Sequence, residues 1–127
     1  MLFRSKLEKK VQQLAGGPHA TDSTHRHRLR IAVKRLRYAI DFFRALFDAA
    51  GVRAYGSALA AVQDSLGTLN DCVTARRLLD DVGPGRDVLA HAQALECVLE
   101  WLSARERAHL LMLDSKCAEW RAQKPFW

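Results

Sequence analysis

The sequence predicts an all-α protein, an antiparallel four-helix bundle that forms a single domain over residues 1–127. Apolar residues recur at intervals of three and four, the period of a helix with one buried face. Only 7 glycines and 3 prolines interrupt the chain, so turns are few, the elements between them are long, and a many-stranded sandwich or barrel is excluded. Because the connections are short, successive helices are expected to pack antiparallel.

The expected helices are separated by three breaks. Two of them are Gly16-Gly17-Pro18 and Gly83-Pro84-Gly85, which favour turns. A softer break falls near residues 48–52, where Gly51 is expected to adopt the left-handed conformation that closes a helix. The helices are therefore expected over about residues 2–15, 23–49, 53–82 and 87–121.

The first helix precedes the Gly-Gly-Pro break, and the other three carry apolar stripes that justify them in turn. Asp22, Ser23 or Thr24 is expected to cap the second helix. The apolar stripe of the second helix consists of Leu29, Val33, Leu36, Ile40, Phe43 and Phe47. The stripe of the third helix consists of Leu59, Val62, Leu66, Leu69 and Val73. The fourth helix has no Gly or Pro and carries Leu95, Val98, Leu99, Leu102 and Leu113 with Trp101 and Trp120, the tryptophans being read as packing groups.

The composition restricts the class of protein. Cys72, Cys97 and Cys117 are widely spaced without a CxxC pair, so neither a disulfide framework nor a zinc knuckle is encoded. A reducing cytoplasm is therefore the expected location. No apolar run approaches the ~20 residues that a membrane span needs, and no membrane partner is expected.

The net charge of +6 is concentrated on the second helix. Six cations and no acid lie from His25 to Arg37, while the other 14 basic and 14 acidic residues balance. On a helical wheel His27, Arg30, Lys34, Arg37 and Tyr38 form one stripe beside the apolar face, and Arg28 and Arg35 lie off it.

Cations in such a row repel one another, and a ligand with serial negative charges relieves the repulsion. This pattern predicts a polyanion partner, although a solvated face, or an internal ion-pair network with Asp64 and Asp71, would show the same sequence pattern.

Other chemistry is poorly supported. His25 and His27 point about 200° apart on a helix, so no shared metal site is expected. Cys72 is read as a small buried side chain, and no catalytic motif occurs. No catalytic residue, metal or cofactor is therefore predicted. Gly67 inside the third helix is expected to reflect close approach of a neighbouring helix or a local bend, with a backbone contact to a ligand as the third reading.

Three stretches of the chain stand out together: HRLRIAVKRLRY from His27 to Tyr38 followed by Asp41-Phe42-Phe43, VQDSLGTLND from Val62 to Asp71, and the final Lys124-Pro125-Phe126-Trp127. In order and spacing they resemble the CHAD family, the conserved histidine α-helical domain. The resemblance covers the second, C-terminal half of a typical member, which contains two four-helix bundles facing one another across a cationic channel. It implies that the chain is one half of that architecture.

The resemblance further implies a bacterial protein that binds inorganic polyphosphate and associates with polyphosphate granules. Carried to matching positions, it makes His27, Arg30, Lys34 and Arg37 the anion-contacting set, with Arg35 and Tyr38 in support. It makes Asp64 and Asp71 the carboxylates that position basic side chains through ion pairs.

Three further expectations accompany this reading. Phosphate-backbone binding to nucleic acid is the alternative function, although the stripe has no Asn or Gln for base readout. Phosphohydrolase activity is not expected, because the sequence shows no cluster of carboxylates suited to two metal ions. A homodimer is expected, because two copies would restore a two-sided channel.

Overall fold

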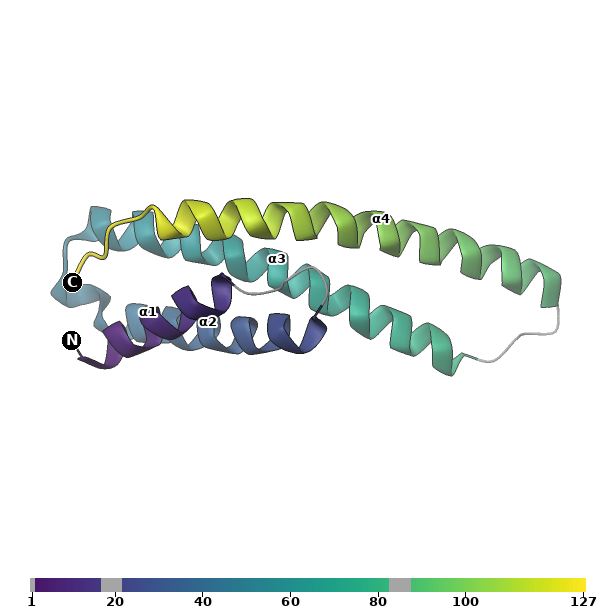
Figure 1. Cartoon of the computed structure of the whole chain (residues 1–127), viewed down its shortest axis with the longest axis horizontal. Helices are drawn as coiled ribbons and strands as arrows, with labels where there is room; N and C mark the ends of the chain where they lie inside the picture. The colour runs from purple at the N-terminus through teal and green to yellow at the C-terminus, as the bar shows by residue number, and fades with distance from the viewer. Residues whose placement is uncertain (1, 17–21, 83–87) are drawn as a thin grey trace.

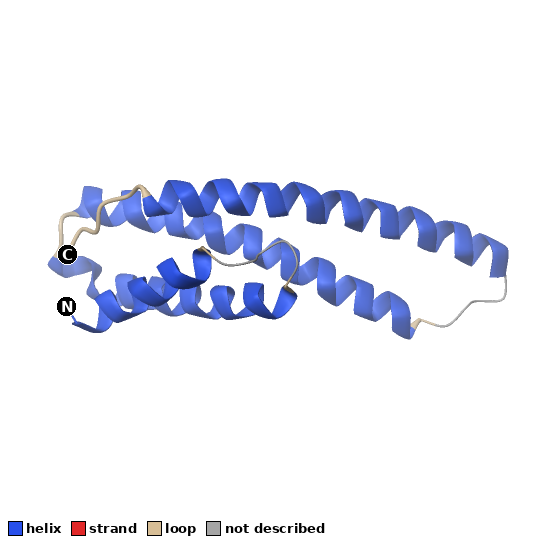
Figure 2. Ribbon diagram, viewed as in Figure 1, coloured by secondary structure: helices blue, strands red, loops and turns tan. Residues whose placement is uncertain are grey.

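The computed structural model describes residues 2–16, 22–82 and 88–127, and within them the chain is helical with no strand. The elements are α1 (Leu2–Ala15), α2 (Ser23–Phe43), the short 3₁₀ helix η1 (Arg44–Leu46), α3 (Ala49–Asp81) and α4 (Val88–Arg121) (Figures 1 and 2). The predicted fold class, four α-helices packed antiparallel, is confirmed. The breaks at Gly17-Pro18 and Gly83-Pro84-Gly85 lie outside the described residues.

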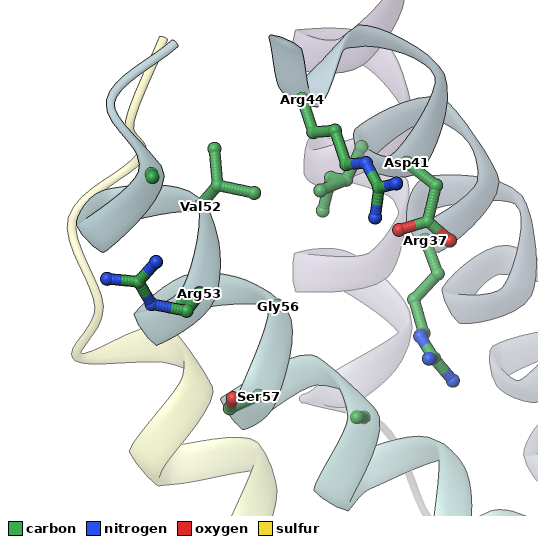
Figure 3. A pocket seen from close by; sticks show the side chains of 10 residues that line it. Arg37, Asp41, Arg44, Val52, Arg53, Gly56 and Ser57 are labelled. Atoms are coloured by element: carbon green, nitrogen blue, oxygen red, sulfur yellow. The ribbon is translucent and has the colours of Figure 1, made fainter.

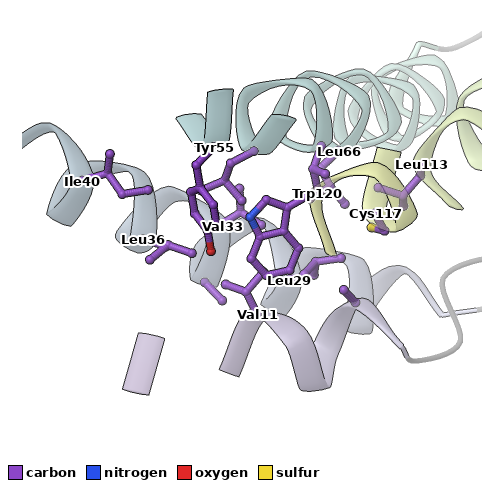
Figure 4. Packing of buried hydrophobic residues seen from close by; sticks show 14 of the residues in the cluster. Val11, Leu29, Val33, Leu36, Ile40, Tyr55, Leu66, Leu113, Cys117 and Trp120 are labelled. Atoms are coloured by element: carbon purple, nitrogen blue, oxygen red, sulfur yellow. The ribbon is translucent and has the colours of Figure 1, made fainter. Parts of the chain in front are cut away.

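The four helices differ in length, and this decides where the core lies. The long helices α3 and α4 run side by side as a hairpin, and α1 and α2 pack along one half of it (Figure 1). The apolar core fills that half, around Val11, Leu29, Leu66, Leu113 and Trp120 (Figure 4). Burial of these side chains is the main stabilising contribution.

The opposite half of the hairpin has only two helices, so several of its apolar side chains stay exposed. Leu78 is 60% exposed and Leu89 is 71% exposed. Trp101, read from the sequence as a packing group, is 59% exposed, and Val98 is 41% exposed. Trp120, in contrast, is fully buried against Tyr55.

Helix α2 begins as the sequence predicts. Asp22 is the N-cap, and its carboxylate accepts a hydrogen bond of 3.0 Å from the backbone N–H of His25. The first four positions of the expected stripe, Leu29, Val33, Leu36 and Ile40, are buried. The last two, Phe43 and Phe47, are only half-buried, because α2 ends at Phe43 and Phe47 lies beyond it.

The break between α2 and α3 falls earlier than predicted. Helix α2 ends at Phe43, and α3 begins at Ala49 because the carboxylate of Asp48 accepts a hydrogen bond of 2.9 Å from the N–H of Gly51. The expectation that Gly51 closes the second helix in a left-handed conformation is wrong. Gly51 lies in the first turn of α3, and no described glycine has a positive φ.

Gly67 is not explained by a close helix contact. A Cβ atom added there would meet nothing within 4 Å, so the predicted close approach of a neighbouring helix is wrong. The residue instead lines a surface hollow between α2 and α3.

The cysteines are free thiols. Cys72 is buried, as the sequence predicts, and so is Cys117, whereas Cys97 is exposed. Burial raises the pKa of the Cys117 thiol to about 11. Within the described part of the chain, no helix has the length and apolar character that crossing a bilayer requires.

Candidate functional site

The predicted basic stripe lies along α2 at its boundary with α3. Arg30 lines a hollow of about 350 Å³ whose other walls come from α3, with Gln63, Asp64, Gly67, Thr68 and Asp71. His27 is exposed and joins Arg30 in a smaller recess with Ser23 and Asn70. The structure therefore brings the amino-terminal members of the stripe together along one groove.

Lys34 and Tyr38 form a pair one helical turn apart. Both are exposed, and the Lys34 ammonium lies 5.6 Å from the centre of the Tyr38 ring. A cation over an aromatic face is stabilised by the ring quadrupole while its outward side stays open to solvent. Tyr38 therefore orients Lys34 without neutralising its charge.

Arg30 and Arg37 are less exposed than Lys34. The Nη1 of Arg37 donates a hydrogen bond of 2.7 Å to Oε1 of Gln63 on α3. Arg30 is half-buried, and its Nε is buried without a hydrogen-bond partner in the described structure. Restricting a side chain before binding lowers the entropic cost of binding, so the hydrogen bond to Gln63 partly preorganises Arg37.

The stripe keeps its charge because no described carboxylate lies within the 4.0 Å ion-pair distance of His27, Arg30, Lys34 or Arg37. An internal ion-pair network does exist, but its α2 member is Arg26. Glu106 on α4 pairs with Arg26 at 3.8 Å and with Arg76 at 3.2 Å. Arg26 is buried and lines the same recess as His27 and Arg30, one helical turn before Arg30.

Asp64 and Asp71 lie on α3 in the hollow that contains Arg30, and both are exposed. Neither comes within 4.0 Å of a cationic group in the described part of the chain. Ion pairs of these two carboxylates are therefore not formed in this structure, and their positioning role stays a prediction.

Arg35 lies apart from the stripe. It lines a hollow between α1 and α2 together with Arg28 and Lys10. The structure therefore does not bring Arg35 together with Arg30 and Lys34, and its supporting role also stays a prediction.

Sequence reasoning missed a second cluster of arginines. A cavity between the end of α2 and the start of α3 is lined by Arg37 together with Arg44, Arg53 and Ser57 (Figure 3). Arg44 continues the three- and four-residue spacing of the stripe through Asp41, which was a signal in the sequence. Arg53 had no such signal, since only the turn between the helices brings it to the same cavity as Arg44.

In the described regions of the chain, no three His, Cys, Asp or Glu side chains are grouped to hold a metal ion. His25 Nε2 lies 2.6 Å from the carbonyl oxygen of Leu14 on α1. This hydrogen bond gives His25 a structural partner away from His27.

Residues 3–80 match the family model of the CHAD domain, which is more than half of the chain. The chain belongs to the CHAD family. The matched segment of this CHAD domain contains α1, α2 and nearly all of α3, and with them the whole basic stripe. Comparison with curated proteins and with solved structures gave no significant match.

Proposed function

We propose that this CHAD domain binds inorganic polyphosphate without hydrolysing it. The anion-contacting groups are His27, Arg30, Lys34 and Arg37, with Tyr38 holding Lys34. The observation that carries the proposal is the absence of a described carboxylate within ion-pair distance of these four side chains. A row of cations that the protein leaves uncompensated is stabilised by a linear ligand with one negative charge per unit.

The supporting roles follow from position. Asp64 and Asp71 lie on the α3 wall of the hollow, and we expect their negative charge to position Arg30 and to keep the polymer on the α2 side. Arg35, with Arg28 and Lys10, gives a separate cationic surface between α1 and α2, which adds long-range attraction. The expected location is the cytoplasm, at polyphosphate granules.

The experiment is a titration with polyphosphate of defined lengths. We expect affinity to rise with chain length and to fall steeply with salt, because binding releases counterions from the polymer. The double variant Arg30→Ala/Lys34→Ala should lose most of the affinity. The control Lys9→Ala/Arg77→Ala removes the same charge from exposed positions on α1 and α3. Equal affinity of the two double variants would contradict the proposal.

Two further arms test the alternatives. Duplex or single-stranded nucleic acid, at equal phosphate concentration, should compete poorly with polyphosphate. A preference for nucleic acid would reverse the assignment. Release of orthophosphate from polyphosphate in the presence of Mg²⁺ or Mn²⁺ would show that the domain is an enzyme.

A homodimer would strengthen binding, because the stripe contacts a polymer from one side only. Two copies facing the same chain would double the contacts without any new kind of site. Light scattering with and without polyphosphate tests this, and a monomer under both conditions would remove the dimer from the proposal.

A further inference from the structure

The cavity at the end of the stripe is a built cationic pocket. Its volume is about 460 Å³, within the range of small-molecule sites. Figure 3 shows Arg37, Asp41 and Arg44 on one wall and Arg53 and Ser57 on the facing helix. The remaining lining is small or apolar: Ile40, Ala49, Val52, Gly56 and Ala60.

The pocket has more positive than negative charge. Its lining contains three arginines and one carboxylate, a formal surplus of two positive charges. Asp41 forms no ion pair within 4.0 Å with a cation in the described part of the chain. Arg44 and Arg53 therefore keep guanidinium groups that are free to bind an oxyanion through paired N–H donors.

The α3 wall leaves room for such an anion. Gly56 has no side chain, and a Cβ atom added there would meet nothing within 4 Å. Ser57, next to it, adds a hydroxyl donor to the lining. Arg53 and Ser57 are four residues apart, so they lie on the same face of α3.

We propose that this pocket binds the terminal phosphate group of a polyphosphate chain, an inference that rests on the proposed function and extends it. An internal phosphate carries one negative charge. A terminal group ionises a second time near neutral pH, as a phosphate monoester does, and then carries close to two. The surplus of two positive charges in the pocket matches the end of the chain better than its middle.

The position of the pocket supports the same assignment. Arg37 belongs both to the stripe and to the pocket lining, and it lies about 15 Å along α2 from His27. The next stripe position is Asp41, whose carboxylate repels a polymer that would continue along the helix. A chain lying on the stripe therefore ends at the cavity that Arg44 and Arg53 line.

Pyrophosphate tests the proposal, because it consists of two terminal groups and has no internal one. Calorimetric titration should show binding to the wild-type domain, and Arg44→Ala/Arg53→Ala should weaken it by at least about tenfold, the loss expected for two charge-assisted contacts. Arg30→Ala/Lys34→Ala should weaken it less than about threefold, since those residues lie outside the pocket. The control is again Lys9→Ala/Arg77→Ala.

A second comparison separates chain ends from total charge. Linear tripolyphosphate has two ends, whereas cyclic trimetaphosphate has none. The Arg44→Ala/Arg53→Ala variant should lose affinity for the linear molecule and keep its affinity for the cyclic one. Phosphorus NMR of a longer chain should show broadening of the terminal resonance first in wild type, and equal broadening of all resonances in the variant.

The outcomes distinguish this proposal from the proposed function. If pyrophosphate binds equally to Arg44→Ala/Arg53→Ala and to the control, the end-group pocket is wrong. Polyphosphate binding that still depends on Arg30 and Lys34 would then leave the proposed function intact. If the linear and cyclic molecules lose affinity alike in the variant, the pocket contributes charge only and does not select chain ends.

Discussion

Arg37 on α2 donates a hydrogen bond of 2.7 Å from Nη1 to Oε1 of Gln63 on α3. Gln63 lines the hollow that contains Arg30, and Arg37 lines the cavity that contains Arg44 and Arg53. The bond therefore lies where the two proposed anion sites meet. A neutral amide acceptor fixes the direction of the guanidinium and leaves its charge for a ligand, which a carboxylate at the same position would not do.

Replacing Gln63 by leucine removes the acceptor while keeping similar volume. We expect polyphosphate affinity to fall by about two- to fivefold, because Arg37 loses its fixed orientation. The free energy of unfolding should fall by about 1 kcal/mol, the net value of one hydrogen bond. Titration and urea unfolding measure the two effects, with Gln13→Leu on the exposed face of α1 as the control. Unchanged affinity would show that the bond does not position Arg37.

The sequence predicted the helices well where the signal was local. The carboxylate of Asp22 and the spacing of Leu29, Val33, Leu36 and Ile40 indicate the start and the buried face of α2 within its own segment of sequence. The end of α2 was predicted too late in the chain, because Asp48 caps the start of α3 where the sequence was expected to continue the second helix. Helical periodicity alone does not reveal whether residues 48–52 end one helix or begin the next.

The site was predictable in part for the same reason. The stripe from His27 to Arg37 lies on one helix, so its spacing was readable in the sequence. The Arg53 contribution to the pocket depends on how α3 packs against α2, which no single-helix pattern contains. The ion pair between Arg26 and Glu106 joins residues 80 positions apart in the sequence, so it could not be predicted from a single-helix pattern either.

Gly67 offers a test of helix stability beside the site. Because a Cβ atom there would meet nothing within 4 Å, Gly67→Ala should raise the free energy of unfolding by about 0.5–1 kcal/mol, through the lower entropy of the unfolded chain. Gly51→Ala is the contrasting variant, since its Cβ would lie 3.1 Å from Cβ of Phe126. It should bring no gain. Thermal or urea unfolding measures both, and a destabilised Gly67→Ala would contradict the open space beside α3.

Arg4 anchors the start of α1 to the aromatic residues around the carboxyl end of the chain. It is 4% exposed, and its guanidinium carbon lies 4.3 Å from the centre of the Phe47 ring. Phe43 and Trp127 lie at 5.2 and 5.4 Å. Two of its nitrogens, Nε and Nη1, are buried without a hydrogen-bond partner. The residue therefore stabilises the fold through ring contacts and packing, against the cost of buried unpaired donors.

Substitution of Arg4 separates these contributions. Arg4→Ala should lower the free energy of unfolding by about 2–3 kcal/mol, because it opens a cavity among the rings. Arg4→Met keeps the length of the side chain and removes the unpaired donors, so we expect a loss of less than about 1 kcal/mol. Urea unfolding of the two variants gives the comparison. Equal losses of unfolding free energy in the two variants would show that the stabilisation comes from the positive charge of Arg4 and not from its packing.

The buried acids Cys117 and Tyr55 make the fold sensitive to alkaline pH. Burial raises the pKa of the Cys117 thiol from 9.0 to about 11. Burial, with the nearby charge of Glu8, raises the pKa of the Tyr55 hydroxyl, which lies 3.3 Å from Oε1 of Glu8. Both groups keep their protons in the folded state at a pH where the unfolded chain releases them.

The free energy of unfolding should therefore be insensitive to these groups below pH 9, and should decrease as pH rises from 9 toward 11. In the variant Cys117→Ala, the free energy of unfolding should decrease less steeply with pH than in wild type. Tyr55→Phe should show the same effect at the upper end of the pH range. The control Cys97→Ala, at an exposed position, should follow the wild type. Urea unfolding at a series of pH values tests this. A Cys117→Ala slope equal to that of wild type would show that the thiol is ionised to the same degree in the folded and unfolded states.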